Sequence, residues 1–203
     1  MTAFKVERGA FDPSSVRRWA TTDVRHDDWP VVYTINGQKD VYVGESVNAA
    51  TRMRQHLDSP NAPLMKTFRV VLDGTYNKSV CLDLETYLIR LFNADQKFNV
   101  LNKQTSSRNS NYYDRHRYRD GFEDVFEFLK SEGLFTSTKS LEDIENSNLF
   151  KLSPFVSLTQ TQALAVAEIL EKIIHPAPDC TGEPIVVQGD PGGLPPSFGP
   201  FAL

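Results

Sequence analysis

The segment VVYTINGQKDVYVGESVNAATRMRQHL, residues 31–57, holds the strongest local folding signal in the chain. Its two runs at 31–35 and 41–43 are rich in β-branched and aromatic residues, which favour strands. Between them, Asn36 and Gly37 form a pair that tolerates the positive φ of tight hairpin turns. This part of the segment therefore predicts a β-hairpin.

The hairpin is followed by a helix signal. Ser46 or Asn48 can cap a helix that ends near Leu57, and Pro60 then stops it. Further elements are expected as a strand over 67–72, a helix over 82–93, an extended piece over 98–102 and an amphipathic helix over 122–129. Strands and helices mixed in this order predict an α+β fold.

Composition and charge limit the class of protein. The chain has 203 residues, of which 40% are hydrophobic and 24% charged, as in soluble globular proteins. No apolar run approaches the roughly 18 residues of a membrane span, and the first 15 residues lack the apolar core of a signal peptide. Cys81 and Cys180 lie far apart without a CxxC partner, which favours reduced thiols and a cytoplasmic location.

The net charge of −4 conceals two different halves. Residues 1–120 hold 18 of the 22 Lys and Arg against 14 of the 26 Asp and Glu, and so carry +4. Residues 121–203 hold the remaining 4 and 12, and so carry −8. Only the first part suits a polyanionic partner such as a nucleic acid.

On the first helix, Arg52 and His56 are four residues apart and share one face. Ala49 and Met53 neighbour them, so this face should turn toward protein. Taken alone, the pair favours two partly buried residues that satisfy hydrogen bonds, and a working site is the alternative.

On the second helix, Glu85 interrupts an apolar stripe. Its neighbours at helical spacing are Cys81, Leu82, Leu88, Ile89 and Phe92. A carboxylate on the buried side of a helix is costly unless a cation or strong donors meet it. Two readings stay open: an ion pair with Arg52, or a divalent metal held by this carboxylate and waters.

Tyr33 and Tyr42 lie on the two strands of the hairpin, where tyrosine is a common packing residue. An ordinary tyrosine has a pKa near about 10 and is a poor base at neutral pH. It can act as a base only where cations or a metal-bound water help to remove its proton.

Residues 106–120 interleave cations with aromatic rings, a composition that suits the phosphates and bases of a nucleic acid. A solvated surface is the alternative. The candidate nucleic-acid-binding residues are Arg108, Tyr112, Tyr113, Arg115, Arg117 and Arg119.

The order of these residues resembles the GIY-YIG endonuclease family over residues 30–102. The matching positions are Val31-Val32-Tyr33, Tyr42-Val43-Gly44, Arg52, His56, Glu85 and Phe98-Asn99-Val100. The family's opening Gly-Ile reads Val31-Val32 here. The resemblance implies a small antiparallel three-stranded sheet flanked by helices.

The resemblance also implies metal-assisted hydrolysis of a phosphodiester. Glu85 would hold one Mg²⁺ or Mn²⁺ ion, and Tyr33 would activate the attacking water with His56 or Tyr42 assisting. Arg52 would neutralise charge that develops on the phosphate, and Asn99 would orient the site.

Residues 158–165 and 185–192 are similar to two motifs of Schlafen-type superfamily 1 helicases. Gln162 would read adenine, and the strand at 185–187 leads into a P-loop-like turn. No lysine follows Gly193, whereas a P-loop needs Gly-Lys-[Ser/Thr] there. We therefore expect no ATP-binding site, and a truncated helicase-like segment.

The sequence predicts a nuclease-like domain over 1–135, a Ser/Thr/Asn-rich linker over 136–153 and the helicase-like segment over 154–203. The expected function is divalent-metal-dependent cleavage of DNA beside a helicase or ATPase partner, with RNA left open as a substrate. The alternative is a catalytically inactive nucleic-acid-binding module that targeted the fused ATPase. No membrane partner is expected.

Overall fold

The computed structural model describes residues 4–102 and 111–151. They belong to the first of two compact units, Met1–Phe155, and the second unit is Val156–Leu203. Arg108, Gln162 and the P-loop-like turn lie outside the described residues, as does the whole predicted helicase-like segment. The structure therefore tests predictions only for residues 4–102 and 111–151.

One mixed sheet organises the described residues, with the strand order β1-β4-β2-β3-β5. The strands are β1 (Lys5–Ala10), β2 (Val31–Gly37), β3 (Asp40–Ser46), β4 (Met65–Leu72) and β5 (Asn99–Val100). All neighbours are antiparallel except β3 and β5, which are parallel. The predicted α+β class is confirmed.

The sheet is larger than the predicted three strands. The antiparallel centre β4-β2-β3 corresponds to the predicted hairpin and third strand. β1 adds to β4 along its whole length, whereas β5 pairs only with Asp40 and Val41 of β3. Because β5 is so short, no strand pairs with this edge of β3 from Val43 onward.

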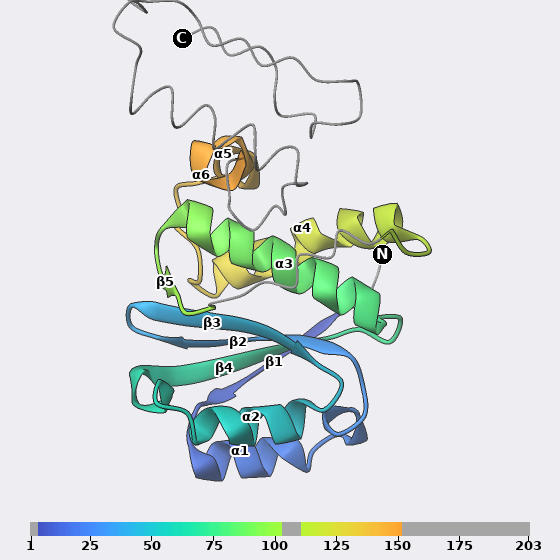
Figure 1. Cartoon of the computed structure of the whole chain (residues 1–203), viewed down its shortest axis with the longest axis vertical. Helices are drawn as coiled ribbons and strands as arrows, with labels where there is room; N and C mark the ends of the chain where they lie inside the picture. The colour runs from blue at the N-terminus through green and yellow to red at the C-terminus, as the bar shows by residue number, and fades with distance from the viewer. Residues whose placement is uncertain (1–3, 103–110, 152–203) are drawn as a thin grey trace, which may run out of the picture. The chain divides into compact units, whose positions relative to one another are not determined.

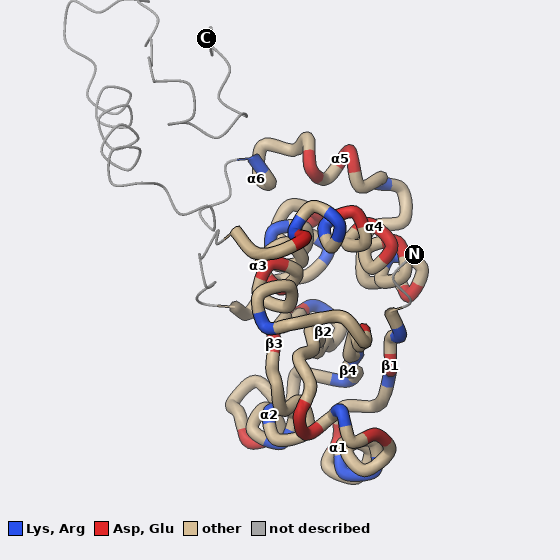
Figure 2. Tube along the Cα trace, turned by 90° about the vertical axis from the view of Figure 1, so that its right-hand side faces the viewer, with Lys and Arg blue, Asp and Glu red and all other residues tan. Residues whose placement is uncertain are grey.

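Helices cover both faces of the sheet (Figures 1 and 2). α1 (Pro13–Ala20) and α2 (Ala49–Leu57) lie on one face, and α3 (Lys78–Asp95) and α4 (Arg115–Ser131) on the other. Short helices complete the set: η1 (Val24–His26), η2 (Ala62–Leu64), α5 (Leu141–Asn146) and α6 (Asn148–Lys151).

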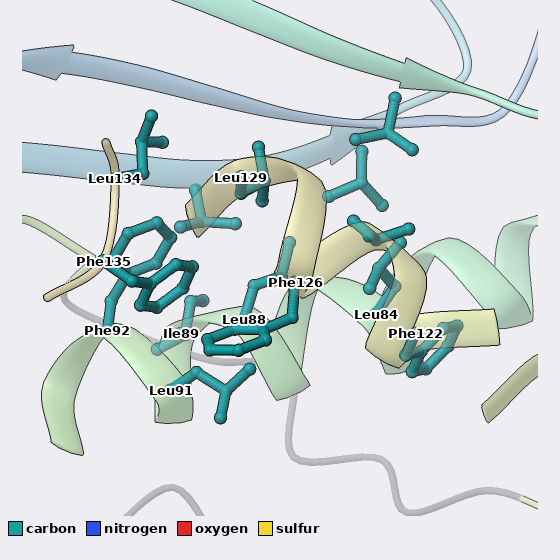
Figure 3. Close-up of a cluster of buried hydrophobic side chains, with 14 of the residues drawn as sticks. Leu84, Leu88, Ile89, Leu91, Phe92, Phe122, Phe126, Leu129, Leu134 and Phe135 are labelled. Atoms are coloured by element: carbon teal, nitrogen blue, oxygen red, sulfur yellow. The ribbon is translucent and has the colours of Figure 1, made fainter. Parts of the chain in front are cut away.

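The larger core lies between the sheet and the α3/α4 layer (Figure 3). Phe92 of α3 stacks on Phe135 with ring centroids 4.4 Å apart, and Phe126 of α4 lies 4.7 Å from the same ring. Burial of such aromatic side chains is a main source of folding free energy. This core fixes α3, and with it Glu85, against β3.

The hairpin turn uses glycine for a reason other than the predicted positive φ. Among the described residues, Gly133 is the glycine with positive φ. A Cβ on Gly37 would lie 1.9 Å from the Leu64 carbonyl oxygen, so close backbone approach demands glycine there. The turn itself is formed by Gln38 and Lys39, between β2 and β3.

β1 and α1 have no counterpart in the sequence prediction. They are joined through Glu7, whose Oε2 accepts hydrogen bonds from Trp19 Nε1 at 2.6 Å and from His26 Nε2 at 2.7 Å. His26 is fully buried, and its Nδ1 lies 3.0 Å from the Trp19 carbonyl oxygen. Both ring nitrogens therefore face acceptors when Glu7 is ionised.

The linker predicted over 136–153 is instead folded through Lys151. α5 begins with a capping box between Ser140 and Asp143, and Ile144 and Phe150 are buried. Arg90 of α3 lies over the Phe150 ring at 4.1 Å and donates to the Phe150 carbonyl oxygen. α5 and α6 therefore continue the α3/α4 layer.

Candidate active site

Two hairpin strands place the candidate tyrosines on the α1/α2 face of the sheet. Tyr33 of β2 is paired with Gly44 of β3, and Tyr42 lies two residues before that glycine. A Cβ on Gly44 would lie 2.4 Å from Tyr33 Oη and 2.9 Å from Tyr42 Cε1. Glycine is therefore required at this position because the Tyr33 ring lies across it.

α2 brings Arg52 and His56 onto the same tyrosine. Asn48 caps the helix by accepting from Thr51 N, which confirms one of the two predicted caps. His56 Nε2 lies 2.8 Å from Tyr33 Oη, and Arg52 Nε donates to that oxygen at 3.3 Å. The His56 ring also lies 4.6 Å from the Tyr42 ring, so the four predicted residues form one cluster.

The protonation states in the cluster follow from burial. Burial, and then the positive charge of Arg52, lower the pKa of His56 to about 4, so its imidazole is neutral at pH 7. Burial raises the pKa of Tyr33, although Arg52 opposes the shift. Tyr33 therefore keeps its proton, and His56 Nε2 accepts it in the tautomer that carries the ring proton on Nδ1.

Glu85 of α3 lies close enough to the cluster for its charge to interact with Arg52 and Tyr33. It is half-buried on α3 and accepts a hydrogen bond from the backbone of Glu45, the residue after Gly44. Burial, followed by the nearby charge of Glu45, raises the pKa of Glu85 to about 7. The charges of Glu85 and Arg52 interact, yet Arg52 forms no ion pair with any described residue.

This environment fits a bound cation. Lys78 forms an ion pair with Glu45, and no Lys or Arg of the described residues forms an ion pair with Glu85, although the charges of Lys78 and Arg52 act on it. Among residues 4–102 and 111–151, no three His, Cys, Asp or Glu side chains gather into a metal-binding group. A Mg²⁺-like ion with one carboxylate and several waters is compatible with such a site.

Asn99 does not join the cluster. Its side chain donates to Asp40 Oδ1 at 2.9 Å, at the opposite end of β3 from Gly44. Asn102 lies closer, because its amide accepts from Val43 N at 3.0 Å and donates to Val43 O at 2.7 Å. Asn102 thereby holds the strand between Tyr42 and Gly44, and no sequence pattern distinguishes Asn102 from Asn99 for this role.

A cleft of ≈ 600 Å³ adjoins the cluster. Tyr42, Arg52 and His56 line it, whereas Tyr33 is fully buried behind them. The polar lining residues that sequence reasoning missed are Gln55, Ser59, Asn61 and Asn102. Gln55 lies three residues after Arg52 and therefore shares its helix face, which the sequence pattern could have shown. No sequence motif identifies Ser59 or Asn61.

The predicted nucleic-acid-binding segment is directed largely into the protein. Asp83 of α3 accepts from Arg115 Nε at 3.0 Å, Arg119 Nη2 at 2.7 Å and Tyr112 Oη at 3.0 Å. Tyr113 is 88% exposed, and Arg117 is also exposed. Only these two of the described candidates point outward without a structural partner among the described residues.

No family model, curated protein or solved structure matches this chain. No described helix is long and apolar enough to cross a membrane. Any assignment of chemistry must therefore rest on the residues of the cluster.

Proposed function

We propose that this chain is a divalent-metal-dependent endonuclease of the GIY-YIG type that hydrolyses phosphodiester bonds in DNA. One observation carries the proposal: a neutral His56, a protonated Tyr33 and an Arg52 without a carboxylate partner among the described residues meet beside the carboxylate of Glu85. The charge of +4 over residues 1–120 suits a polyanionic substrate.

Arg52 is placed to receive the phosphate. Its side chain is exposed, and its guanidinium, hydrogen-bonded to Gln55 Oε1 at 3.0 Å, keeps donors for phosphate oxygens. Arg52 also lies over the hydroxyl of Tyr33, which is fully buried in the free protein. Movement of Arg52 toward a phosphate would uncover that hydroxyl for a water molecule.

Tyr33 and His56 would then move the proton of the attacking water. The water gives its proton to Tyr33 Oη while Tyr33 gives its own to His56 Nε2, so that the hydroxyl is regenerated and His56 becomes the imidazolium. The 2.8 Å contact already exists, and His56 is neutral at pH 7, so its ring can accept a proton. Because a pKa of about 4 makes His56 a weak base, the transfer requires the negative charge of a bound phosphate to raise that pKa. Tyr33 thus need not become a phenolate.

Glu85 would hold the divalent ion, which supplies Lewis-acid stabilisation of charge on the phosphate oxygens. The carboxylate must be ionised for this role, and its pKa of about 7 makes it so in half of the molecules at neutral pH. Asn102 would keep β3, and therefore Tyr42 and Gly44, in position.

Cleavage of plasmid, branched and single-stranded DNA and of RNA, with and without Mg²⁺ or Mn²⁺, tests the proposal. Replacement Glu85→Gln should reduce metal-dependent cleavage by at least about a thousandfold while DNA binding changes little. Glu127→Gln, a matched change at an exposed site on α4, should leave cleavage unchanged. Normal cleavage by the Glu85→Gln variant would refute the assignment.

The second candidate is a nucleic-acid-binding module without catalysis. The complete burial of Tyr33 favours it, because a water molecule has no direct access to the hydroxyl in the free protein. Gel-shift binding with no cleavage under any of the metal conditions would support this candidate.

A further inference from the structure

The cleft beside the cluster is lined by both apolar and polar residues. Phe11, Ile35 and Met65 are at most 7% exposed and belong to the packed core beneath the cleft. Tyr42 and Leu101 are half-buried and supply the accessible apolar surface. Because these residues pack against the core, the cleft does not need to fold around a ligand.

The polar lining residues of the cleft include amides and a hydroxyl. Gln55 accepts from Arg52, whereas the Asn102 amide uses both its oxygen and its nitrogen on Val43, and the Ser59 hydroxyl donates to the His56 carbonyl oxygen. The second amide hydrogen of Asn102 and the amide nitrogen of Gln55 remain as donors. The Asn61 side chain does not cap η2 and is exposed. Asn and Gln side chains are the usual partners of base edges in nucleic-acid recognition.

The size and position of the cleft limit its occupant. A volume of ≈ 600 Å³ falls in the range of small-molecule pockets, about 300–1,000 Å³. A base within a duplex presents only its edges in the grooves, so its ring face cannot contact Tyr42 or Leu101, the half-buried apolar residues of the cleft. A base turned out of the stack can make that contact while its neighbouring phosphate stays near Arg52.

We propose that this cleft binds an unpaired nucleobase of the substrate strand, adjacent to the phosphate held by Arg52. Arg52 and His56 belong to the cluster around Tyr33 and also line the cleft. One nucleotide can therefore place its phosphate at the cluster and its base in the cleft. This inference rests on the proposed function and deepens it: the substrate is a strand with an extrahelical or single-stranded nucleotide at the cut. Aromatic and apolar surfaces bind such bases with little sequence preference.

Binding of labelled oligonucleotides in EDTA tests the inference apart from cleavage. Three duplexes are compared by fluorescence anisotropy: fully paired, with one bulged nucleotide, and with one bulged abasic nucleotide. The abasic bulge keeps the bend and the phosphate and lacks only the base. We expect the base-containing bulge to bind about tenfold more tightly than the other two.

Two variants connect this preference to the cleft. Asn61→Trp should fill the cleft entrance and abolish the tenfold preference, and Asn146→Ala, at an exposed position on α5, should retain it. Equal binding of the two bulged duplexes, an unchanged preference in Asn61→Trp, or no binding to any duplex would each overturn the inference. A base-dependent preference without cleavage would support base binding in the cleft and refute the nuclease. Cleavage without that preference would support the nuclease and refute base binding in the cleft.

Discussion

Two regions of this molecule combine tyrosines with arginines and behave in opposite ways. In the first region, the half-buried carboxylate of Asp83 accepts hydrogen bonds from two arginines and a tyrosine hydroxyl. Around Tyr33, Arg52 has no carboxylate partner among the described residues, although Glu85 is nearby. The residue types are alike, and the difference is that the carboxylate and the cations are paired around Asp83 and not around Tyr33, for which we propose a reactive role.

The two carboxylates lie two residues apart on α3, and their pKa values are shifted in opposite directions. Burial would raise the pKa of Asp83, but hydrogen bonds from Arg119 and Arg115 outweigh it and lower the pKa to about 2. Burial and Glu45 raise the pKa of Glu85 to about 7. Asp83 in its ionised form therefore stabilises the fold, whereas ionised Glu85 destabilises it.

The largest effect on stability is expected for Asp83→Asn. The change removes a largely buried carboxylate that forms ion pairs with Arg115 and Arg119, and we expect it to lower the free energy of unfolding by about 3 kcal/mol. Glu85→Gln should instead raise it by about 1 kcal/mol at neutral pH, because an ionised buried carboxylate is removed. Urea denaturation at neutral pH measures the free energy of unfolding of both variants. A change of the same sign and size in the two variants would contradict the difference between Asp83 and Glu85.

The pH dependence of this stability has a definite sign. Because the folded pKa of Asp83 lies below its ordinary value of 3.8, its contribution is present above that pH and is lost as the pH falls toward about 2. The stability difference between the wild type and Asp83→Asn should shrink over the same range.

The next largest effect is expected for Tyr33→Phe on cleavage. Loss of the hydroxyl removes the contacts to both His56 and Arg52, and we expect cleavage to slow by about fiftyfold. Tyr112→Phe is the matched change at Asp83 and should leave the cleavage rate unchanged while lowering stability by about 1 kcal/mol. A loss of cleavage in both variants would mean that the two clusters do not differ in role.

A smaller, pH-dependent effect is expected for metal binding. Since Glu85 must lose a proton with a pKa of about 7, affinity for Mn²⁺ should rise about tenfold between about pH 5.5 and pH 6.5 and level off above about pH 8. Electron paramagnetic resonance of free Mn²⁺ measures this without cleavage. A flat profile would indicate that Glu85 does not bind the ion.

The smallest effect is expected for Tyr113→Ala and Arg117→Ala. Both side chains are exposed and stay outside the Asp83 cluster, so each should weaken DNA binding by about two- to threefold at low salt and leave stability unchanged. Anisotropy titrations measure the binding. If neither variant binds DNA more weakly than the wild type, the segment is not part of the nucleic-acid-binding surface.

The strongly patterned elements were predictable from sequence. The hairpin, α2, β4 and α3 follow from alternation and helical spacing, although α3 starts at Lys78, a turn before its predicted start. β1 was missed because its residues, KVERGA, are mostly polar, and its inward Glu7 is satisfied by Trp19 and His26. Those partners are brought together only by the tertiary fold.

The site was predictable in part, and for a physical reason. Arg52 and His56 share a helix face whatever the fold, and Tyr33 and Tyr42 share a sheet face once the hairpin register is set. The choice between Asn99 and Asn102 depends on where the short parallel strand ends, which no pattern in the sequence fixes. Likewise, the arginines of residues 115–119 look like phosphate ligands until Asp83 is seen to bind them.

The edge of β3 is closed by three different means. β5 pairs with its first residues, the Asn102 amide occupies both backbone groups of Val43, and Glu85 accepts from the backbone of Glu45. An unpaired strand edge is a template for intermolecular pairing and aggregation. The side chains that support the reactive cluster therefore also deny this edge to a strand from another molecule, so Asn102→Ala should increase self-association.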